Sequence, residues 1–270
     1  MLSRYSSALL ALFIFSGAVG AIELRGNMIQ GSLIRGKTTP GNTVLFNGKE
    51  IDVAATGEFA FGFSRDDVLE HSLVEVEPSG KRNEHKLYIS KREYNIQRIE
   101  GLPQKYVAPP PEVTARIRKD NQQVGQARQT NDKRLDFMQD FIWPAEGPIS
   151  GVYGSQRVLN GEPRNPHYGV DVAAPTGTPV YAPADGIVTL FVPDMYYSGG
   201  TMIIDHGFGV SSTFLHLSKG LVEKGTQVKQ GDLVAEIGAT GRVTGAHLDW
   251  RINWFKVRLD PELLVPSRKQ

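Results

Sequence analysis

Four polar residues in the second half of the chain have types and spacing suited to binding a metal ion. His167 and Asp171 are separated by three residues in "NPHYGVDV", and His247 and Asp249 alternate in "GAHLDW". If the second stretch is a strand, His247 and Asp249 point to the same face, because side chains alternate along a strand. Imidazole nitrogens and carboxylate oxygens are common zinc ligands. These residues therefore predict a metal site.

The chemistry of such a site would be hydrolysis. A catalytic zinc ion has three protein ligands and leaves its fourth position to water. The ion lowers the pKa of that water and polarises a carbonyl, so that an amide becomes attackable near neutral pH. We expect His167, Asp171 and a ligand from the late strand to hold the ion. His216, in "FLHL", could act beside them.

The residues also allow a structural interpretation. Taken alone, His167 and Asp171 could form a hydrogen-bonded surface pair, and His216 and His247 could be buried structural histidines. Asp249 could pair with Arg251, which would share its face of the strand.

The region from residue 143 onward must position these side chains, and its sequence indicates an antiparallel sheet. Short apolar stretches are separated by turn signals such as "HGFG", "KQGD" and "ATG". The intervals leave no room for crossover helices, so consecutive strands should pair antiparallel. The candidate strands are "GVDVA", "PVYA", "GIVTLFV", "TMIIDH", "SSTFLHL", "LVAEIG" and "HLDWRIN".

Two further regions precede the predicted antiparallel sheet. Residues 22–90 alternate apolar and polar positions between turn signals, which predicts a small β-sandwich. Their segment "TTPGNTVLFNGKEIDVAATGEFAF" resembles bacterial immunoglobulin-like modules. Residues 91–142 contain the proline-rich "LPQKYVAPPPEV", followed by many helix-forming residues, which predicts a linker and a polar helix. The fold class is therefore mainly β, with the third domain over residues 143–270. His71 and His85 of the sandwich are expected at the surface.

Composition and the N-terminus indicate an exported protein. The formal net charge of +1 gives no reason to expect nucleic acid as a partner, and the absence of cysteine excludes disulfides and thiolate ligands. Arg4 precedes the apolar stretch "ALLALFIFSGAV", which is short for a membrane span. We expect a signal peptide over residues 1–21, cleavage after Ala21, no stable membrane insertion afterwards, and a periplasmic location.

The motifs together resemble a known family. From Trp143 to Pro261, the ordered set "HYGVDVAAPTGTPVYAPADGIV", "IIDHGFGVSSTFLHLS" and "VEKGTQVKQGDLVAEIGATGRVTGAHLDW" is similar to the lysostaphin/LytM-type zinc metalloendopeptidases of the bacterial cell wall. The resemblance implies one zinc ion and hydrolysis of peptide bonds in peptidoglycan stems or cross-links. It also implies zinc ligation by His167 and Asp171, with His216 and His247 as the catalytic residues.

The sequence departs from the family at the third zinc ligand. The family has a histidine where this chain has Asp249. Zinc with two histidines and one aspartate carries a formal charge of about +1, whereas one histidine and two aspartates give about 0. We therefore expect Asp249 to bind the metal in a centre whose rate or metal preference is altered.

Two alternatives remain. Some relatives with lost ligands bind the cell wall and activate an amidase, so the chain could be a catalytically impaired factor of that kind. The stretches "APADGIV" and "VEKGTQVKQGDLVAEIG" also resemble biotinyl and lipoyl carrier domains, although no modifiable hairpin lysine is evident. Within the enzyme hypothesis, Tyr196 and Tyr197 are expected to line the substrate groove.

Overall fold

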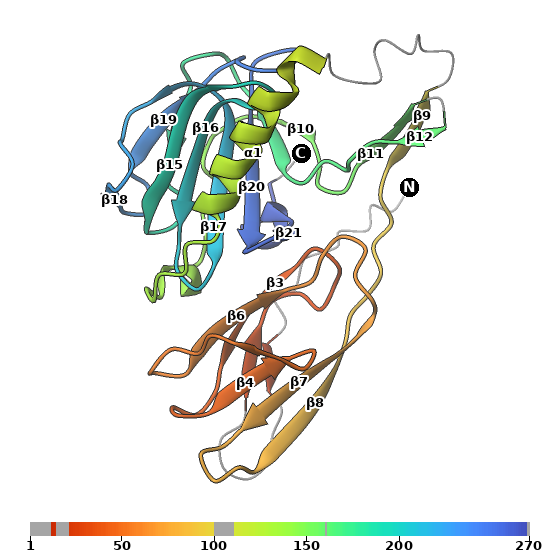
Figure 1. The fold of residues 1–270 in the computed structure, drawn as a ribbon, viewed down its shortest axis with the longest axis vertical. Helices are drawn as coiled ribbons and strands as arrows, with labels where there is room; N and C mark the ends of the chain where they lie inside the picture. Colours follow the sequence, from red (N-terminus) through yellow and green to blue (C-terminus); the bar gives the residue numbers. More distant parts are fainter. Residues whose placement is uncertain (1–11, 15–21, 100–110, 160, 269–270) are drawn as a thin grey trace.

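The computed structural model describes residues 12–14, 22–99, 111–159 and 161–268, which form two β-rich bodies joined by a connecting segment (Figure 1). Apart from strand β1 (Leu12–Ile14), the expected signal peptide lies outside the described residues. No helix in the described part of the chain is long and apolar enough to cross a membrane.

The N-terminal body is a sandwich of two antiparallel sheets with a phenylalanine-rich core, as the alternation of residues 22–90 predicted. Phe46, Phe59, Phe61 and Phe63 lie between the sheets, with stacked or edge-on rings. Within the described residues, one sheet has the order β1, β2 (Glu23–Arg25), β3 (Leu33–Lys37) and β6 (Glu58–Gly62), and the other β5 (Lys49–Ile51), β4 (Thr43–Phe46), β7 (Glu70–Val76) and β8 (Arg82–Tyr88).

The expectation that both sandwich histidines lie at the surface is wrong for His71. Its side chain is buried and packs against the rings of Phe46 and Phe63, while Nδ1 bonds to the Asn47 amide at 2.9 Å. The contacts with two aromatic rings and the hydrogen bond to Asn47 account for the burial of this imidazole. His85 is partly exposed and faces Glu75.

The C-terminal body is built on a large antiparallel sheet, again as the sequence predicted. Its central strands are the longest, and β17 pairs with β16, β19 and β20. Among the described residues the sheet has ten strands: β10 (Ile149–Gly151), β13 (Val170–Ala173), β14 (Pro179–Tyr181), β15 (Gly186–Met195), β16 (Gly199–Asp205), β17 (Val210–Gly220), β18 (Gln227–Val228), β19 (Leu233–Ile237), β20 (His247–Trp254) and β21 (Val257–Leu259).

The two faces of the large sheet differ in character. On β20, Leu248, Trp250 and Ile252 belong to the hydrophobic core. The alternate residues, among them Asp249 and Arg251, therefore point to the opposite face. That second face carries the polar residues of interest, so the alternation expected for "HLDWRIN" is confirmed.

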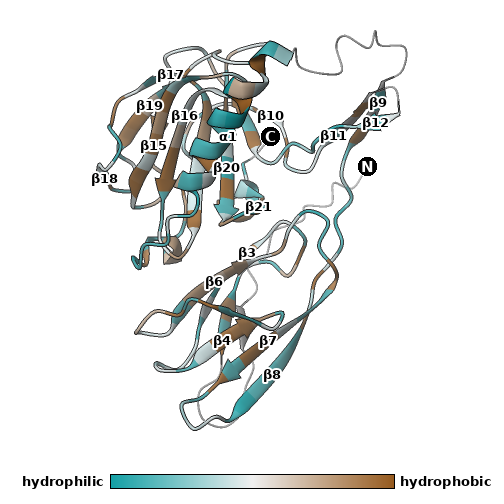
Figure 2. Cartoon of the chain, in the orientation of Figure 1, coloured by the Kyte–Doolittle hydropathy of each residue, from teal (hydrophilic) through white to brown (hydrophobic). Residues whose placement is uncertain are grey.

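The connecting segment is folded onto the large sheet. Helix α1 (Thr114–Ala127) crosses the strands β15 to β17, and Val124 and Ala127 pack on Leu190, Met195 and Ile203 (Figure 1). Its outer side is hydrophilic, whereas the strands beneath are largely hydrophobic (Figure 2). Short 3-10 turns precede and follow α1 at η2 (Pro111–Val113) and η3 (Asp136–Met138).

Residues on both sides of α1 extend the two bodies. Phe137 and Phe141 are fully buried in the core of the large sheet, although they precede the boundary expected at Trp143. Strand β9 (Ile96–Ile99) pairs in parallel with β11 (Gln156–Leu159), which also pairs with β12 (Glu162–Pro163).

The two bodies contact each other through the end of the large sheet. The Trp254 ring meets Phe46 edge-on at 6.4 Å between centroids, and Leu259 packs against Gly62. The buried carboxylate of Asp260 accepts a hydrogen bond from Arg92 Nη1 at 2.6 Å. The sandwich is thus packed against the β20–β21 hairpin, beyond which the 3-10 turn η4 (Pro261–Leu263) follows.

His206 lies in the core of the C-terminal body. Its Nδ1–H donates to the Asp185 carbonyl at 2.7 Å, and its Nε2 accepts from the Ser212 hydroxyl at 2.8 Å. Burial lowers the pKa of His206 to about 4, so the ring is neutral in the folded protein at pH 7. A buried neutral imidazole with both ring nitrogens hydrogen-bonded has a structural role here.

His206 should make the stability of the protein fall in mild acid. The unfolded chain protonates this histidine near its usual pKa of about 6.5, whereas the folded protein does so only near pH 4. The contribution of neutral His206 to the free energy of unfolding is complete above about pH 6.5 and decreases as the pH falls. At pH 4 about 3 kcal/mol of it is lost. Urea unfolding at pH 7 and pH 4 measures the decrease in the free energy of unfolding between the two pH values. This decrease should be smaller in His206→Gln than in the wild type by about 3 kcal/mol. An equal loss in both proteins would contradict the assignment.

Candidate metal centre

The three residues expected to bind a metal converge on one point of the polar sheet face. One nitrogen of His167 and one oxygen each of Asp171 and Asp249 all lie within 4.8 Å of one another. His167 Nε2 is 3.1 Å from Asp171 Oδ1 and 3.5 Å from Asp249 Oδ2. Donors this close can share a single cation.

The register of two neighbouring strands produces this convergence. Asp171 on β13 is paired directly with Asp249 on β20, so their side chains leave the sheet on the same face. Two carboxylates in directly opposite positions repel each other unless a positive charge lies between them. His167, in the loop before β13, is placed beside both.

Two glycines make room for the carboxylates. A Cβ atom on Gly151 would lie 2.2 Å from Asp171 Oδ2, and one on Gly169 would lie 2.4 Å from Asp249 Oδ1. Any other residue would push a carboxylate out of place, because real Cβ atoms do not approach oxygen so closely. Gly151 and Gly169 thus form a cradle around the site, and no signal in the single sequence identified them.

Backbone carbonyls orient the three histidines of the site. Nδ1 faces a carbonyl oxygen in each ring: Val152 for His167 at 3.2 Å, Thr240 for His216 at 2.9 Å and Gly245 for His247 at 2.9 Å. A carbonyl can only accept, so Nδ1 carries the proton and donates. The other nitrogen, Nε2, can then offer a lone pair to a metal or to a proton.

The chemistry of the donor set fits a divalent cation. His167 Nε2 and Asp171 Oδ1 are buried and have no hydrogen-bond partner among the described residues, although they face each other. Burial opposes a charge on His167, but its interactions with Asp171 and Asp249 outweigh burial and raise the pKa of His167 to about 10. The two carboxylates therefore attract positive charge to this point.

Asp249 has a second partner, Arg251, which the sequence had offered as an alternative to metal binding. Arg251 Nε lies 2.9 and 3.1 Å from the two carboxylate oxygens, and Nη2 also donates to Oδ2. Burial alone would raise the pKa of Asp249, but Arg251 holds it well below its usual range. The structure thus shows Asp249 paired with Arg251 and, at the same time, facing His167.

The arginine changes the charge of the centre. One histidine and two aspartates around zinc give a formal charge of about 0, and Arg251 brings the local total to about +1. This equals the total for two histidines and one aspartate. For a zinc ion bound here, Arg251 would therefore offset at least part of the change in Lewis acidity expected from Asp249 alone.

His216 and His247 lie at the edge of the same site. Their ring centroids are 4.8 Å apart, and His247 Nε2 is 3.9 Å from Asp171 Oδ1. His216 has a φ of 64°, which is uncommon for a residue other than glycine and marks a local irregularity of β17. Burial lowers the pKa of His216, so its ring is neutral at pH 7.

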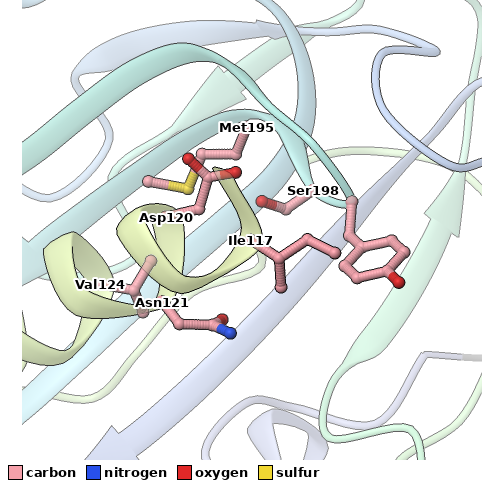
Figure 3. Close-up of a pocket in the computed structure, with 7 residues that line it drawn as sticks. Ile117, Asp120, Asn121, Val124, Met195 and Ser198 are labelled. Atoms are coloured by element: carbon pink, nitrogen blue, oxygen red, sulfur yellow. The ribbon is translucent and has the colours of Figure 1, made fainter. Parts of the chain in front are cut away.

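A small cavity separates α1 from the turn beside His216 (Figure 3). The carbonyl of Ser198 in this turn accepts the backbone N–H of His216 at 2.8 Å. The helix also holds the turn, because Asp120 accepts from the backbone N–H of Tyr196 at 2.8 Å. The lining residues are Ile117, Asp120, Asn121 and Val124 of α1 with Met195, Tyr197 and Ser198. Tyr197 lines this cavity, and Arg242 lies over its ring at 4.4 Å.

Comparison with known proteins identifies the C-terminal domain. Residues 165–261 match Peptidase family M23. The chain is also similar to a crystal structure of a peptidase M23 from Pseudomonas aeruginosa, with 25% identity and a TM-score of 0.69 over 90% of this chain and 96% of that one. The matched segment is thus a peptidase M23 domain, which confirms the family that the motifs indicated.

Two curated relatives come from Vibrio cholerae serotype O1 and are named peptidoglycan DD-endopeptidases. ShyA is 39% identical over 111 residues, which make up 38% of this chain and 26% of ShyA. ShyB is 45% identical over 87 residues, or 32% of this chain and 20% of ShyB. The chain therefore spans about a quarter or less of the length of these relatives.

Asp249→Asn tests whether Asp249 is a metal ligand. The amide keeps the shape of the side chain and still offers an oxygen to Arg251, but it lacks the negative charge that a cation requires. We expect the affinity for zinc to fall at least about a hundredfold, as for loss of one ligand, with the fold retained. Zinc titration followed by circular dichroism measures both. Unchanged affinity in a folded variant would remove Asp249 from the coordination shell.

Gly151→Ala tests the cradle. The new methyl group would displace the Asp171 carboxylate, so zinc affinity should fall about tenfold or more while the thermal midpoint changes little. Gly125→Ala is the matched control, because a Cβ atom there meets nothing within 4 Å. The control should bind zinc like the wild type. Equal zinc affinity in both variants would show that Asp171 does not need the space.

Proposed function

Residues 165–261 form a peptidase M23 domain, and we propose that the protein is an exported, zinc-dependent endopeptidase that hydrolyses peptide bonds in peptidoglycan stems or cross-links. One observation carries this proposal: His167, Asp171 and Asp249 meet within 4.8 Å, beside two further histidines. The names of ShyA and ShyB, both peptidoglycan DD-endopeptidases, support the substrate class.

His167, Asp171 and Asp249 would hold the ion. Zinc, when bound, supplies a Lewis acid that polarises a peptide carbonyl and makes a water molecule easier to deprotonate. The carbonyl of Val152 fixes the His167 ring, and Arg251 fixes Asp249, so that both ligands are oriented before the ion arrives. This preorganisation is the chain's own contribution to the site.

His216 and His247 would move protons on the substrate side. The ring of His216 is neutral at pH 7, and its Nε2 can accept a proton from the attacking water. His247 Nε2 lies at the same site, 3.9 Å from Asp171 Oδ1, and once it carries a proton it can donate a hydrogen bond to the negative oxygen that develops when the carbonyl is attacked. Both rings are held by their Nδ1 hydrogen bonds, so little reorganisation is needed.

The alternative of an impaired factor that activates an amidase is less well supported. Such a factor has no need for converging ligands, a glycine cradle and oriented histidines. All five positions carry residues competent for metal binding or proton transfer, and they lie together. The enzyme is therefore the function that this geometry supports best.

Export follows from the same proposal. Peptidoglycan lies outside the cytoplasm, so the enzyme must cross the inner membrane to reach it. The charged and apolar residues of the N-terminal 21 positions suit a cleaved signal peptide. We place the mature protein in the periplasm.

His247→Ala separates catalysis from metal binding. The variant should retain one zinc ion per chain, because His247 is not among the three ligands, but it should lose about a hundredfold to ten-thousandfold in turnover. Zinc content by elemental analysis and muropeptide release from purified peptidoglycan are the two measurements. Wild-type protein that binds zinc but releases no muropeptides would contradict the proposed function. Loss of zinc from the variant would instead make His247 a ligand.

A further inference from the structure

Three arginines gather on the sheet face that carries the metal centre. Arg251 lies on β20 two residues from Asp249, and Thr213 of β17 is paired directly opposite it. Arg128, the residue after α1, donates from Nη2 to the Thr213 hydroxyl at 3.0 Å. Arg258 on β21 is paired with Asn253, which is the next residue on this face after Arg251. The three side chains therefore project from adjoining positions.

The charges in this cluster do not balance. Among the described residues, Asp249 is the carboxylate next to these arginines, and Asp249 is already paired with Arg251. Arg128 has only 9% of its surface exposed, yet its Nε has no hydrogen-bond partner in the described part of the chain. Arg258 contacts the Tyr168 ring at 5.7 Å, and no carboxylate of the described residues lies within 4.0 Å of it. A buried cation without a counter-charge is costly.

Electrostatics agree with this geometry. Burial and the neighbouring charges of Arg258 and Arg251 hold the pKa of Arg128 well below its usual range. Burial and Arg251 also lower the pKa of Arg258. An anion placed between the guanidinium groups would relieve both effects, because each could donate a charge-assisted hydrogen bond.

We propose that Arg128, Arg251 and Arg258 form a subsite for a free carboxylate of the peptide substrate, next to the metal centre. This inference rests on the proposed function, because peptidoglycan stem peptides carry free carboxylates near their cross-links. Arg251 uses Nε and Nη2 for Asp249, which leaves Nη1 for a ligand. The subsite selects acidic peptides over their amides.

The subsite also assigns a role in substrate binding to the segment that contains α1 and Arg128. Arg128 follows α1 directly, and α1 is held on the sheet by Val124 and Ala127 and by the ion pair of Arg116 with Asp194. The helix therefore brings a guanidinium group from outside the matched M23 segment onto the sheet face beside the metal ligands. A peptidase domain without this segment would lack one of the three donors.

The test compares an acid with its amide. N-acetyl-D-alanyl-D-alanine and its C-terminal amide are titrated into the zinc-loaded full chain by calorimetry. We expect the acid to bind about tenfold more tightly than the amide, as one charge-assisted hydrogen bond allows. Arg258→Gln should remove this preference, and Arg258→Lys should keep part of it. Arg82→Gln, on the exposed strand β8, is the matched control and should behave like the wild type.

Two outcomes would overturn the subsite. Equal affinity for acid and amide in the wild type would exclude it. A preference for the acid that persists undiminished in folded Arg258→Gln would mean that the carboxylate is not held by a subsite that contains Arg258. Muropeptide release is measured on the same preparations, so that the proposed function and the subsite are tested separately. A protein that releases no muropeptides could still prefer the acid to the amide through Arg258. An active protein could lack that preference.

Discussion

Two carboxylates placed directly opposite each other on neighbouring strands are the constraint on which the site depends. Asp171 and Asp249 leave β13 and β20 on the same face because the register pairs them. Like charges in such positions are unfavourable unless a cation lies between them. His167 and Arg251 both contact Asp249, and the cradle of Gly151 and Gly169 leaves room for the carboxylate oxygens. The sheet therefore holds negative charge at one point, which a bound divalent ion would neutralise.

The rest of the molecule supports that face. Trp250 and its neighbours bury the opposite face of β20, so the polar residues cannot turn inward. The helix α1 covers part of the polar face and delivers Arg128, while the sandwich packs against the β20–β21 hairpin through Trp254. Segments outside the M23 match thus contribute to the surroundings of the metal centre as well as to stability.

Much of this could be predicted from the sequence, because the residues with chemistry stand in period-two strands and in an ordered set of motifs. The antiparallel sheet and the convergence of His167, Asp171 and Asp249 could both be predicted in this way. Contacts between distant segments could not be predicted. The burial of His71 depends on phenylalanines of other strands, and the cradle depends on the register of β10, β13 and β20. Arg128 has no local signal at all, since only the docking of α1 brings it to Thr213.

The most direct measurement of the central claim is X-ray diffraction from crystals grown with zinc, with data collected on both sides of the zinc absorption edge. The account predicts one strong anomalous peak about 2.0–2.2 Å from His167 Nε2 and from one oxygen each of Asp171 and Asp249. Arg251 should remain paired with the outer oxygen of Asp249. A fully occupied zinc ion held by other residues, or ligands that stay apart in saturating zinc, would contradict it.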